Sequence, residues 1–461
     1  MPLDMRDWIK KLEEEDQILT VKKPVKPKEE MGALLWQSRE KSLFFENLEG
    51  HPGWRSLGMA PANLRQGALA FNTTLEKLFP EVAERFKKRM PVELVETGPV
   101  KEVILHGDEV DLTSLPVHTC GTKDVGPYIT AGLCVTKDPD TGIFNMSFHR
   151  LQVKGKRRTG ILAVPRHTRI NLEKWEARGE AMPIAIFIGH HPLYYMAAAT
   201  TGSYEMDELE LAGGLIGESV RVVKCETIDL VVPFDAEIVL EGHILPGVRE
   251  DEGPFAEFQD YYYGGMGKNA VIEFDCMTRR KDAIFKNIQN GSEVEGCVFH
   301  KIPMAAEIYN NIVKVNGYAD IKNVLTLPGI FGVVVQMTPR FYGEAKNVLL
   351  GVLSSAYLHP KVIIAVDEDV NIFNYWEIIW AINTRVDPQN DIITIPNTRM
   401  IPMDASTREI TPVGGNTWQA IGSKVIIDAT KPPTSDPIAR DRLERIKPMG
   451  YETVRLEDFL D

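Results

Sequence analysis

The sequence has little of what marks secreted or membrane proteins. Its 461 residues include only five cysteines, and no two of them form a Cys-x-x-Cys motif. The odd number and the scattered positions argue against a disulfide framework and against a zinc site. No apolar run reaches the about 18 residues that a membrane-spanning helix needs. The charged N-terminal segment lacks the apolar stretch of a signal peptide. We therefore expect a cytoplasmic protein with no membrane segment.

Positively charged residues are outnumbered by negatively charged ones. The chain carries 52 Lys and Arg against 65 Asp and Glu, which gives a formal net charge of −13 and a pI near 5.4. This balance argues against nonspecific nucleic-acid binding and against an anionic membrane surface, although a locally basic pocket could still hold an anionic ligand. The apolar content of 44% is ordinary for a soluble globular enzyme, and the length predicts two or three domains.

Neither internal repeats nor the phosphate-binding motifs GxGxxG and GxxxxGK[ST] occur in the sequence. Residues 1–100 instead read as a small α/β unit. A helix is expected from Asp4 and Met5 to about Glu14, a strand follows at 17–21, and Pro80 opens a helix over 81–90. From about residue 102, short apolar strands separated by Gly and Pro turns predict a sandwich or barrel, interrupted by one helix at 205–216. Two of the expected strands span 144–153 and 238–245.

The pattern changes again near Pro303. Helical and extended segments alternate from there, which predicts a parallel α/β domain. The expected helices are 305–316, 345–357 and 376–383, and the expected strands are 330–336 and 362–366. A polar tail begins at Pro432 and Pro433, and its last helix is expected to pack on a neighbouring element or subunit.

The hexapeptide Glu252-Gly253-Pro254-Phe255-Ala256-Glu257 is the strongest local indication of chemistry. Gly-Pro forces a bend, and a bend between two carboxylates can bring both into one pocket. Like charges held close cannot both ionise freely, so one of them can carry a proton at neutral pH. Taken alone, two surface glutamates that flank a turn would be the simpler interpretation.

Upstream polar residues favour the pocket interpretation. Asn145 and Arg150 lie in one strand-like run, but residues five apart face opposite sides of a regular strand, so a shared site needs a bulge or a ligand that wraps the strand. His167 follows the end of a strand. Glu208 shares a helix face with Leu211 and Leu215, and a buried carboxylate requires a partner.

These residues suggest two clusters. Asn145, His167 and Glu208 offer an amide oxygen, an imidazole and a carboxylate, a set that suits Mn²⁺ or Mg²⁺ bound also by phosphate. Arg150 would join Glu252 and Glu257 in a carboxylate–guanidinium–carboxylate network, because arginine recognises carboxylates in a bidentate fork.

Taken together, these segments closely resemble the UbiD-type decarboxylases, which use prenylated FMN. The resemblance covers essentially the whole chain. The matching segments are PYITAGLCVTKDPDTGIFNMSFHR (127–150), PRH (165–167), DELELAGGLIGE (207–218), VKCETIDLVVPFDAEIVLEG (223–242), EGPFAEF (252–258) and KVIIAVDEDVNIFNYWEIIWAINTRVDP (361–388).

The resemblance implies a multidomain α/β fold. An N-terminal α/β domain (1–105) would precede a central split β-barrel that binds the cofactor (106–302). A linker helix (303–325) and a C-terminal α/β domain that forms oligomers (326–461) would follow. The assembly would be a homodimer or homohexamer.

The resemblance also implies residue roles. Arg150, Glu252 and Glu257 would be catalytic, with Glu257 the proton donor. Mn²⁺ (or Mg²⁺ or Fe²⁺) would bind Asn145, His167 and Glu208, and K⁺ would bind near Met146, Ala197, Ala198, Thr200 and Glu208. The expected cofactor-binding residues are Asn145, Ser147, Phe148, His149, Arg150, Arg166, His167, Ala199, Thr200, Glu208 and Lys361.

The implied activity is reversible, non-oxidative decarboxylation. Substrates could be hydroxybenzoates, heteroaromatic or polycyclic acids, or cinnamate-type acids, and a flavin prenyltransferase would supply the cofactor. His149, the pair His190-His191, and His300 depart from relatives, which leaves the substrate open. The sequence does not give the physiological direction either. A surface or core role is the simpler interpretation of His190 and His191. A non-catalytic prenylated-flavin carrier and an FMN-binding oxidoreductase are the alternative functions.

Overall fold

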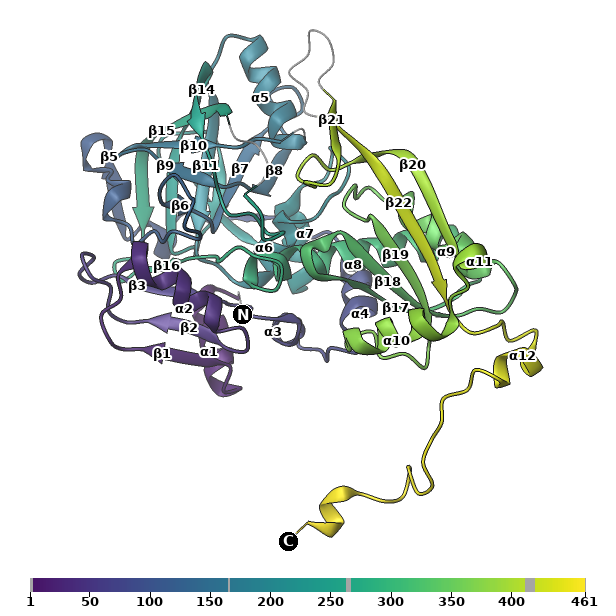
Figure 1. The fold of residues 1–461 in the computed structure, drawn as a ribbon. Coiled ribbons are helices and arrows are strands. Elements are labelled where there is room, and N and C mark those ends of the chain that lie inside the picture. The colour runs from purple at the N-terminus through teal and green to yellow at the C-terminus, as the bar shows by residue number, and fades with distance from the viewer. Residues whose placement is uncertain (1–2, 165, 263–266, 411–418, 461) are drawn as a thin grey trace.

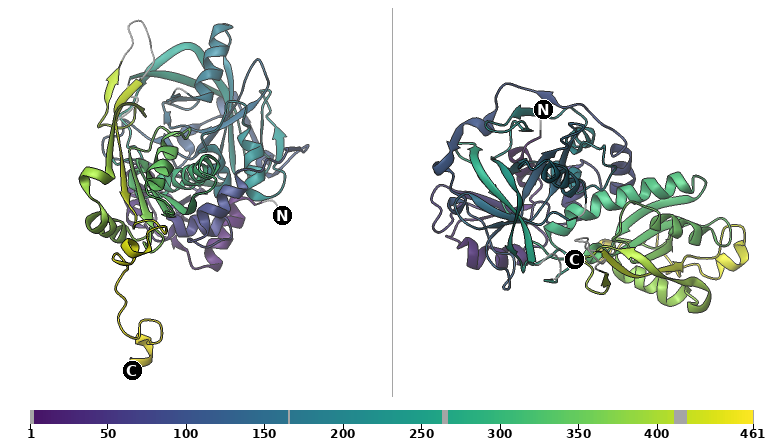
Figure 2. Two further views of the ribbon diagram at one scale, coloured as in Figure 1. Left: turned by 90° about the vertical axis from the view of Figure 1, so that its right-hand side faces the viewer. Right: turned by 90° about the horizontal axis from the view of Figure 1, so that it is seen from above.

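The computed structural model describes residues 3–164, 166–262, 267–410 and 419–460, so Pro165 of the expected PRH segment lies outside the described residues. The N-terminal and central parts form one body and the C-terminal domain forms a second (Figure 1). The long helix α8 (Glu295–Val315) lies between them (Figure 2). Within the described ranges, none of the helices is long and apolar enough to cross a bilayer.

The N-terminal part is a small α/β unit, as the sequence predicts. Its first helix, α1 (Met5–Glu14), begins where expected because the Asp4 side chain accepts the backbone N–H groups of Arg6 and Asp7. The helix expected at 81–90 instead spans Leu78–Arg85, with Pro80 as its third residue; the first-turn N–H that proline lacks has no helical partner anyway. Its other elements are α2 (Gly32–Gln37), α3 (Leu64–Ala70), β1 (Ile18–Val21), β2 (Ser42–Phe45) and β3 (Arg55–Gly58). The sheet order is β1-β2-β3-β16, so β16 (Ile284–Lys286), from far along the chain, completes it.

The central part is a nine-stranded sheet in the order β6-β9-β10-β15-β14-β11-β7-β8, with β5 added on β15. Its strands are β5 (Val103–His106), β6 (Tyr128–Ile129), β7 (Gly132–Lys137), β8 (Phe144–Phe148), β9 (Leu151–Val153), β10 (Arg158–Ile161), β11 (Met182–Ile188), β14 (Ile238–Glu252) and β15 (Gly267–Arg279).

The connections within this sheet show that it curls into a split barrel. β6 and β9 lie at one end of the strand order, and β7 and β8 lie at the other. Yet only two residues separate β6 from β7, and only His149 and Arg150 separate β8 from β9. The two ends must therefore approach each other without pairing. We call the gap between them the seam, and His149 and Arg150 cross it.

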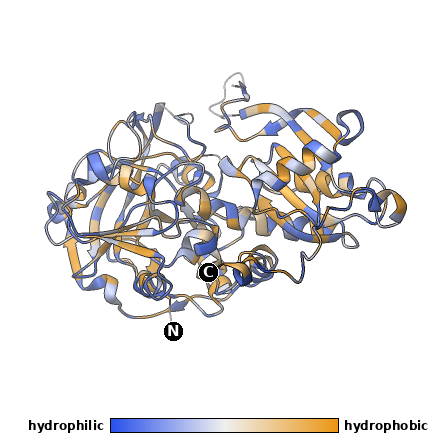
Figure 3. Cartoon of the chain, turned by 60° about the horizontal axis from the view of Figure 1, so that its bottom comes forward, coloured by the Kyte–Doolittle hydropathy of each residue, from blue (hydrophilic) through white to orange (hydrophobic). Residues whose placement is uncertain are grey.

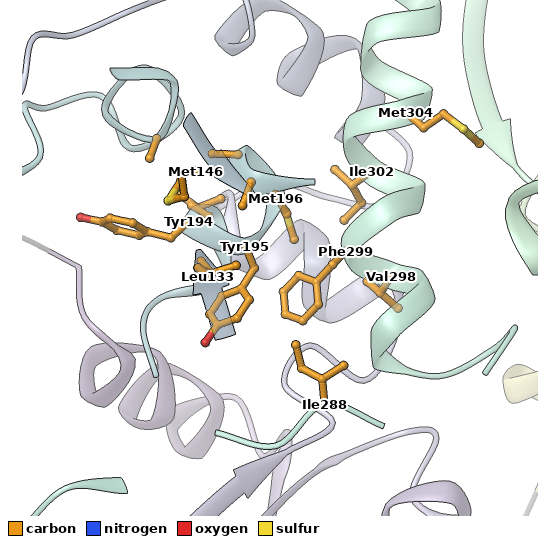
Figure 4. Close-up of a cluster of buried hydrophobic side chains, with 14 of the residues drawn as sticks. Leu133, Met146, Tyr194, Tyr195, Met196, Ile288, Val298, Phe299, Ile302 and Met304 are labelled. Atoms are coloured by element: carbon orange, nitrogen blue, oxygen red, sulfur yellow. The ribbon is translucent and has the colours of Figure 1, made fainter. Parts of the chain in front are cut away.

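Shorter elements pack against the strands of the barrel. They are α5 (His167–Ala177), α6 (Pro192–Ala198), α7 (Glu208–Ile216) and a small sheet of β4 (Glu93–Leu94), β12 (Arg221–Lys224) and β13 (Val231–Pro233). A core of buried side chains packs between the barrel, α6 and α8, among them Tyr195, Met196, Phe299 and Ile302 (Figure 4). The rings of Tyr195 and Phe299 stack with centroids 5.0 Å apart.

Helix α8 corrects one prediction. The sequence predicts a helix over 305–316, but α8 starts at Glu295 and contains Pro303. The carboxylate of Glu295 accepts the N–H groups of Met59 and Ala60, each at 2.8 Å, and pairs with the buried Lys286. These contacts and the packing of Phe299 outweigh the one helical hydrogen bond that Pro303 cannot make.

The C-terminal domain is an α/β unit, as expected, but its sheet is mixed and not parallel throughout. Its strands β17 (Asp320–Thr326), β18 (Gly332–Thr338), β19 (Val362–Asp367), β22 (Gln419–Ala429) and β20 (Ile392–Met400) lie in this order, and β21 (Arg408–Ile410) pairs with β22. β18, β19 and β22 are parallel, whereas β17 and β20 are antiparallel edges. The helices are α9 (Glu344–Leu353), α10 (Tyr375–Arg385) and α11 (Pro388–Asp391).

Apolar stretches gather on the packed strands and helices of this domain (Figure 3). Beyond β22 the chain passes through α12 (Pro437–Asp441) and then leaves the body as an exposed tail (Figure 1). The remaining short helices are a π-helical turn at Pro27–Met31 and 3₁₀ turns at Pro99–Lys101, Gly107–Glu109, Leu112–Ser114, Pro328–Ile330 and Leu456–Phe459.

Candidate active site

A cavity of about 490 Å³ lies where the barrel seam, α8 and the C-terminal domain meet. It brings together most of the residues that the sequence singles out. Those that line it are Asn145, Met146, Ser147, Phe148, His149, Arg150, Arg166, His167, Ala198, Ala199, Thr200, Glu208 and Glu257. Cavities of this size and apolar lining with a few convergent polar groups are typical of small-molecule sites.

Arg150 lies at one end of this cavity, which we call the carboxylate end. Its Nε and Nη2 atoms donate to the two carboxylate oxygens of Glu252 at 3.1 and 2.7 Å, and its Nη1 donates to Glu257. All three side chains are buried, with exposed fractions of 8%, 2% and 5%. The predicted carboxylate–guanidinium–carboxylate arrangement is therefore present, and Glu252 supports it from behind the cavity lining.

The break between β8 and β9 explains how Asn145 and Arg150 can face one site although a regular strand would point them to opposite sides. Asn145 lies in the regular strand β8, which ends at Phe148. His149 and Arg150 then leave the strand geometry to cross the seam, so the alternation of side-chain faces is reset there. Asn145 and Arg150 can thus line the same cavity although they are five residues apart.

The bend in the hexapeptide brings Glu252 and Glu257 to one guanidinium. β14 ends at Glu252, and Gly253 has a φ of +86°, a conformation that glycine adopts without a Cβ clash. The Asp124 carboxylate fixes the far side of the bend, because it accepts the N–H of Ala256 at 2.7 Å. Aromatic packing completes the arrangement, with the Arg150 guanidinium 5.3 Å from the ring centroid of Phe255.

The protonation of Glu257 follows from its surroundings. Burial raises the pKa of the Glu257 carboxyl from its ordinary 4.5 to about 7; the Arg150 guanidinium opposes this rise and the Glu252 carboxylate adds to it. A group with this pKa is populated in both forms near neutral pH, which suits an acid or base in proton transfer.

Glu208 lines the same cavity in a second cluster, with Asn145 and His167, which we call the metal end after the ions that the sequence predicts there. It is the first residue of α7, whose start is capped by the Asp207 side chain, and it is 2% exposed. Its Oε2 accepts the Met146 N–H at 2.8 Å, and the Asn145 amide donates to both oxygens at 3.2 Å. The sequence argument that a core-facing Glu208 requires partners is thus confirmed.

His167 completes this cluster. Its Nδ1 lies 3.8 Å from Glu208 Oε1, beyond hydrogen-bond range. The Asn145 amide oxygen accepts a hydrogen bond from Thr168 at 2.9 Å. Among the described residues, no group of three or more His, Cys, Asp and Glu side chains has metal-binding geometry. The expected Mn²⁺ set is not of this kind, because it contains one imidazole, one carboxylate and an amide.

His149 is held as a neutral side chain. Its Nδ1–H donates to the Leu162 carbonyl at 3.0 Å, so Nε2 is the acceptor that faces the Ser147 and Thr168 hydroxyls at 3.1 and 3.0 Å. Burial lowers the pKa of His149 to about 4. His149 therefore orders the hydroxyls beside Asn145 and adds no positive charge.

Two expected ligands lie away from the cavity. The Lys361 ammonium pairs with Asp404 and donates to Ser406, both at 2.8 Å, and does not line the cavity. Ala197 is fully buried in α6, one residue before the lining residue Ala198.

His190 and His191 belong to the core. The sequence favours a surface or a core role for them, and the structure shows the core role. His190 Nε2 donates to Asp235 at 2.9 Å, and the His191 ring packs edge-on against Trp8.

The C-terminal domain supplies lining residues that the sequence argument missed, among them Tyr357, His359 and Arg399. Arg399 and Arg166 are two like charges that line the same cavity, and such an arrangement favours an anion between them. None of the three lies in a recognisable motif, and more than 190 residues separate each from Arg166 (166 against 357 at the nearest). No signal in one sequence could have assigned them to the site.

Comparison with known protein families identifies the chain. Three domains described for 3-octaprenyl-4-hydroxybenzoate carboxy-lyase match in order: the N-terminal domain at residues 9–86, the Rift-related domain at 93–293 and the C-terminal domain at 297–429. The chain belongs to the UbiD family of carboxy-lyases. The predicted family, the mixed α/β multidomain fold and the enzyme class are thereby confirmed.

Named relatives of this UbiD-family chain are decarboxylases. It is 32% identical to the phenolic acid decarboxylase of Bacillus subtilis (strain 168), over 93% of this chain and 92% of the relative. It is 33% identical to the anhydromevalonate phosphate decarboxylase of Methanothermobacter thermautotrophicus, over 93% and 97%. Among solved structures, the UbiD-class enzyme HmfF from Pelotomaculum thermopropionicum in complex with FMN matches with a TM-score of 0.90 and 33% identity, over 99% and 100% of the two chains.

Proposed function

We propose that this UbiD-family enzyme is a prenylated-FMN-dependent decarboxylase that acts reversibly on an aromatic, heteroaromatic or α,β-unsaturated carboxylic acid. The observation that carries the proposal is the buried Arg150 guanidinium shared by Glu252 and Glu257 in the wall of a ligand-sized cavity. A cofactor carrier would need only groups that hold the cofactor. The carboxylate pair also includes an acid, Glu257, whose proton can be transferred near pH 7. A carrier would have no use for such a group.

The chemistry requires a cofactor, because removing CO2 from an sp² carbon leaves a carbanion that no protein side chain can stabilise. Prenylated FMN would supply the electron sink when bound. Arg150, held by Glu252, would orient the substrate carboxylate, because arginine recognises a carboxylate in a fork of two N–H donors. Glu257 would donate its proton to the carbon that loses CO2, and would take it back in the carboxylation direction.

The metal end offers donors that fit the expected ions. The Asn145 amide, the His167 imidazole and the Glu208 carboxylate would hold Mn²⁺, and Mg²⁺ or Fe²⁺ could replace it. K⁺ would bind near Met146, Ala197, Ala198 and Thr200, with Glu208 shared between the two ions. Arg166, which lines the cavity and donates to Thr201, would bind the cofactor phosphate. Lys361 would reach that phosphate only by leaving Asp404.

We further propose the domain division 1–105, 106–302, 303–325 and 326–461, with assembly into a homodimer or homohexamer. A flavin prenyltransferase would supply the cofactor. The solved relatives include an evolved dimeric form of HmfF in complex with prenylated FMN, at 32% identity and a TM-score of 0.87.

CO2 release from a panel of aromatic and α,β-unsaturated acids tests the proposal. The enzyme would be produced together with a flavin prenyltransferase, and its bound cofactor identified by absorbance and mass spectrometry. We expect prenylated FMN to be bound and at least one acid of the panel to release CO2. Bound prenylated flavin without release from any acid would favour a carrier, and unmodified FMN with redox turnover would favour an oxidoreductase.

A further inference from the structure

The segment 124–128, which ends at the first residue of β6, runs alongside the hexapeptide 252–257. Neither Asp124 nor Tyr128 lines the cavity, and the proposed chemistry gives them no role. Three hydrogen bonds join the two segments: the Gly253 N–H donates to the Tyr128 hydroxyl at 3.2 Å, the Val125 N–H to the Pro254 carbonyl at 3.1 Å, and the Ala256 N–H to the Asp124 carboxylate at 2.7 Å. The bend between the two catalytic carboxylates is thus held at three points.

Asp124 ties this bend to a loop far away in the sequence. Its Oδ2 accepts the N–H groups of Cys120 and Gly121 at 3.1 and 2.9 Å, and its Oδ1 accepts that of Ala256. The two segments fit closely, because a Cβ added at Gly121 would lie only 2.9 Å from the Cβ of Ala256. Ala256, the residue before Glu257, is therefore held in place.

Tyr128 holds the other end of the bend. Its side chain is 1% exposed, and its ring packs on Phe255 with centroids 4.4 Å apart. The hydroxyl that accepts the Gly253 N–H is also hydrogen-bonded to Glu252. Burial and the nearby Glu252 carboxylate raise the pKa of Tyr128, so this side chain carries no charge near neutral pH.

Asp124 also adds a third carboxylate beside the proton donor. The titratable groups beside Glu257 are the Arg150 guanidinium, the Glu252 and Asp124 carboxylates and the Cys120 thiol. Burial raises the pKa of Cys120, so the thiol is neutral. Burial also raises the pKa of Asp124, but three N–H donors favour its anion. Its negative charge favours the protonated form of Glu257, as that of Glu252 does, and Arg150 opposes both.

We propose that Asp124 and Tyr128 are positioning residues for the proton donor: they fix the bend that carries Glu257, and the charge of Asp124 helps to keep Glu257 protonated. This role deepens the proposed function and rests on it, because it takes Glu257 as the acid. The two residues should differ in one respect. Only Asp124 is charged, so only its removal should change the pH at which Glu257 loses its proton.

Steady-state kinetics of holoenzyme variants test the positioning, with an acid that the wild-type enzyme decarboxylates. Asp124→Ala removes the acceptor of three N–H groups, so kcat should fall about 10- to 100-fold through a misplaced Glu257, while KM stays within about threefold. Asp124→Asn keeps one oxygen that can accept the Ala256 N–H and should restore part of kcat. Tyr128→Phe keeps the ring against Phe255 but loses the hydroxyl, and should lower kcat about 3- to 10-fold.

The pH profile separates this role from an ordinary structural contact. Without the charge of Asp124, Glu257 should lose its proton more easily. In Asp124→Asn, the fall of kcat/KM above about pH 7 should therefore begin about 0.5 to 1 pH unit lower. Tyr128→Phe should leave the midpoint in place. Infrared titration of the Glu257 carboxyl in the holoenzyme, assigned by its loss in Glu257→Gln, should show the same shift and does not depend on turnover.

Asp111→Asn is the matched control. Asp111 also accepts a backbone N–H, that of Thr113 at 2.9 Å, but it is not among the groups beside Glu257 and should change neither kcat nor the midpoint. Flavin content and Tm show whether each variant is loaded and folded. If Asp124→Ala does not fold, Asp124→Asn decides.

The outcomes separate the two proposals. Wild-type kcat in Asp124→Asn and Asp124→Ala, or an unshifted infrared midpoint in Asp124→Asn, would overturn the positioning role alone. A lower kcat with an unshifted midpoint would make Asp124 a structural contact only. If the wild-type holoenzyme released CO2 from none of the acids, the proposed function would fail and the positioning role with it, and the infrared midpoint would still show whether Asp124 controls the proton of Glu257.

Discussion

The two ends of the cavity hold buried carboxylates in different ways. At the metal end, Glu208 is surrounded by donors from its neighbours, the Met146 N–H and the Asn145 amide. At the carboxylate end, Glu252 and Glu257 share the single guanidinium of Arg150. Glu252 receives the two-pronged contact, and burial leaves Glu257 with a raised pKa.

This difference indicates how one cavity could both hold a cofactor and transfer a proton. A carboxylate held by several fixed donors is kept in one position, which suits the binding of a cation. A carboxylate that must share one cation with a second carboxylate is suited to exchange a proton. This contrast supports the proposed division between a cofactor-binding end and a proton-transfer end, and substitutions at the two ends should have different consequences.

The largest effect is expected from Glu257→Gln. The amide keeps the size of the side chain but cannot donate a carboxylic proton, so kcat for decarboxylation should fall by about 10²- to 10⁴-fold, the usual contribution of general acid catalysis. Bound cofactor should be unchanged, because Glu257 is not at the metal end. Asp251→Asn, at an exposed acid in the same segment, is the control, and CO2 release measures both. Full activity of Glu257→Gln would refute the assignment of the proton donor.

Arg150→Met tests the shared guanidinium through stability. Removing the cation leaves two buried carboxylates without a charged partner, although the Asn269 amide still donates to Glu252. This should lower the free energy of unfolding by about 3 kcal/mol at pH 7. Arg169→Met, which breaks the more exposed ion pair with Glu173, should cost about 0.5 kcal/mol or less. Denaturant unfolding of apo protein gives both values. Equal losses in the two variants would mean that the Arg150 contacts add nothing beyond a surface pair.

A smaller effect is expected from pH, on both kcat/KM and stability. Glu257 has a pKa raised to about 7, so its protonated form dominates below that pH and is lost as pH rises through it. In the decarboxylation direction kcat/KM should therefore fall about tenfold per pH unit above about 7. The folded protein also binds this proton more tightly than the unfolded chain, so its contribution to stability is lost as pH rises from 4.5 to about 7.

Glu257→Gln should lack that contribution to the pH dependence of unfolding. A wild-type kcat/KM that stays flat from pH 6 to 9 would contradict the role of this carboxyl as the proton donor.

Much of this arrangement could be predicted from the sequence because local signals were strong. Apolar residues around Glu208 marked it as buried, and the Gly-Pro bend explained how Glu252 and Glu257 could meet. The strand breaks were harder to foresee. Residues 144–153 were expected to form one strand, but the split-barrel topology interrupts it at His149 and Arg150.

The features that the sequence predicted wrongly or missed are set by long-range packing. The start of α8 is fixed by Lys286 and the backbone near Met59, contacts that no local pattern encodes. Strand β14 was expected to end near Leu245, but pairing with β15 extends it to Glu252. The cavity residues His359 and Arg399 come from a domain whose position depends on the whole fold.

The most direct test of the division between the two ends is to measure cofactor and metal content in His167→Ala beside Glu257→Gln. Flavin absorbance and elemental analysis of the purified proteins give both quantities, with His243→Ala as the control. We expect His167→Ala to lose metal and cofactor together, and Glu257→Gln to retain both while losing activity. Retention of metal and cofactor by His167→Ala would contradict the account.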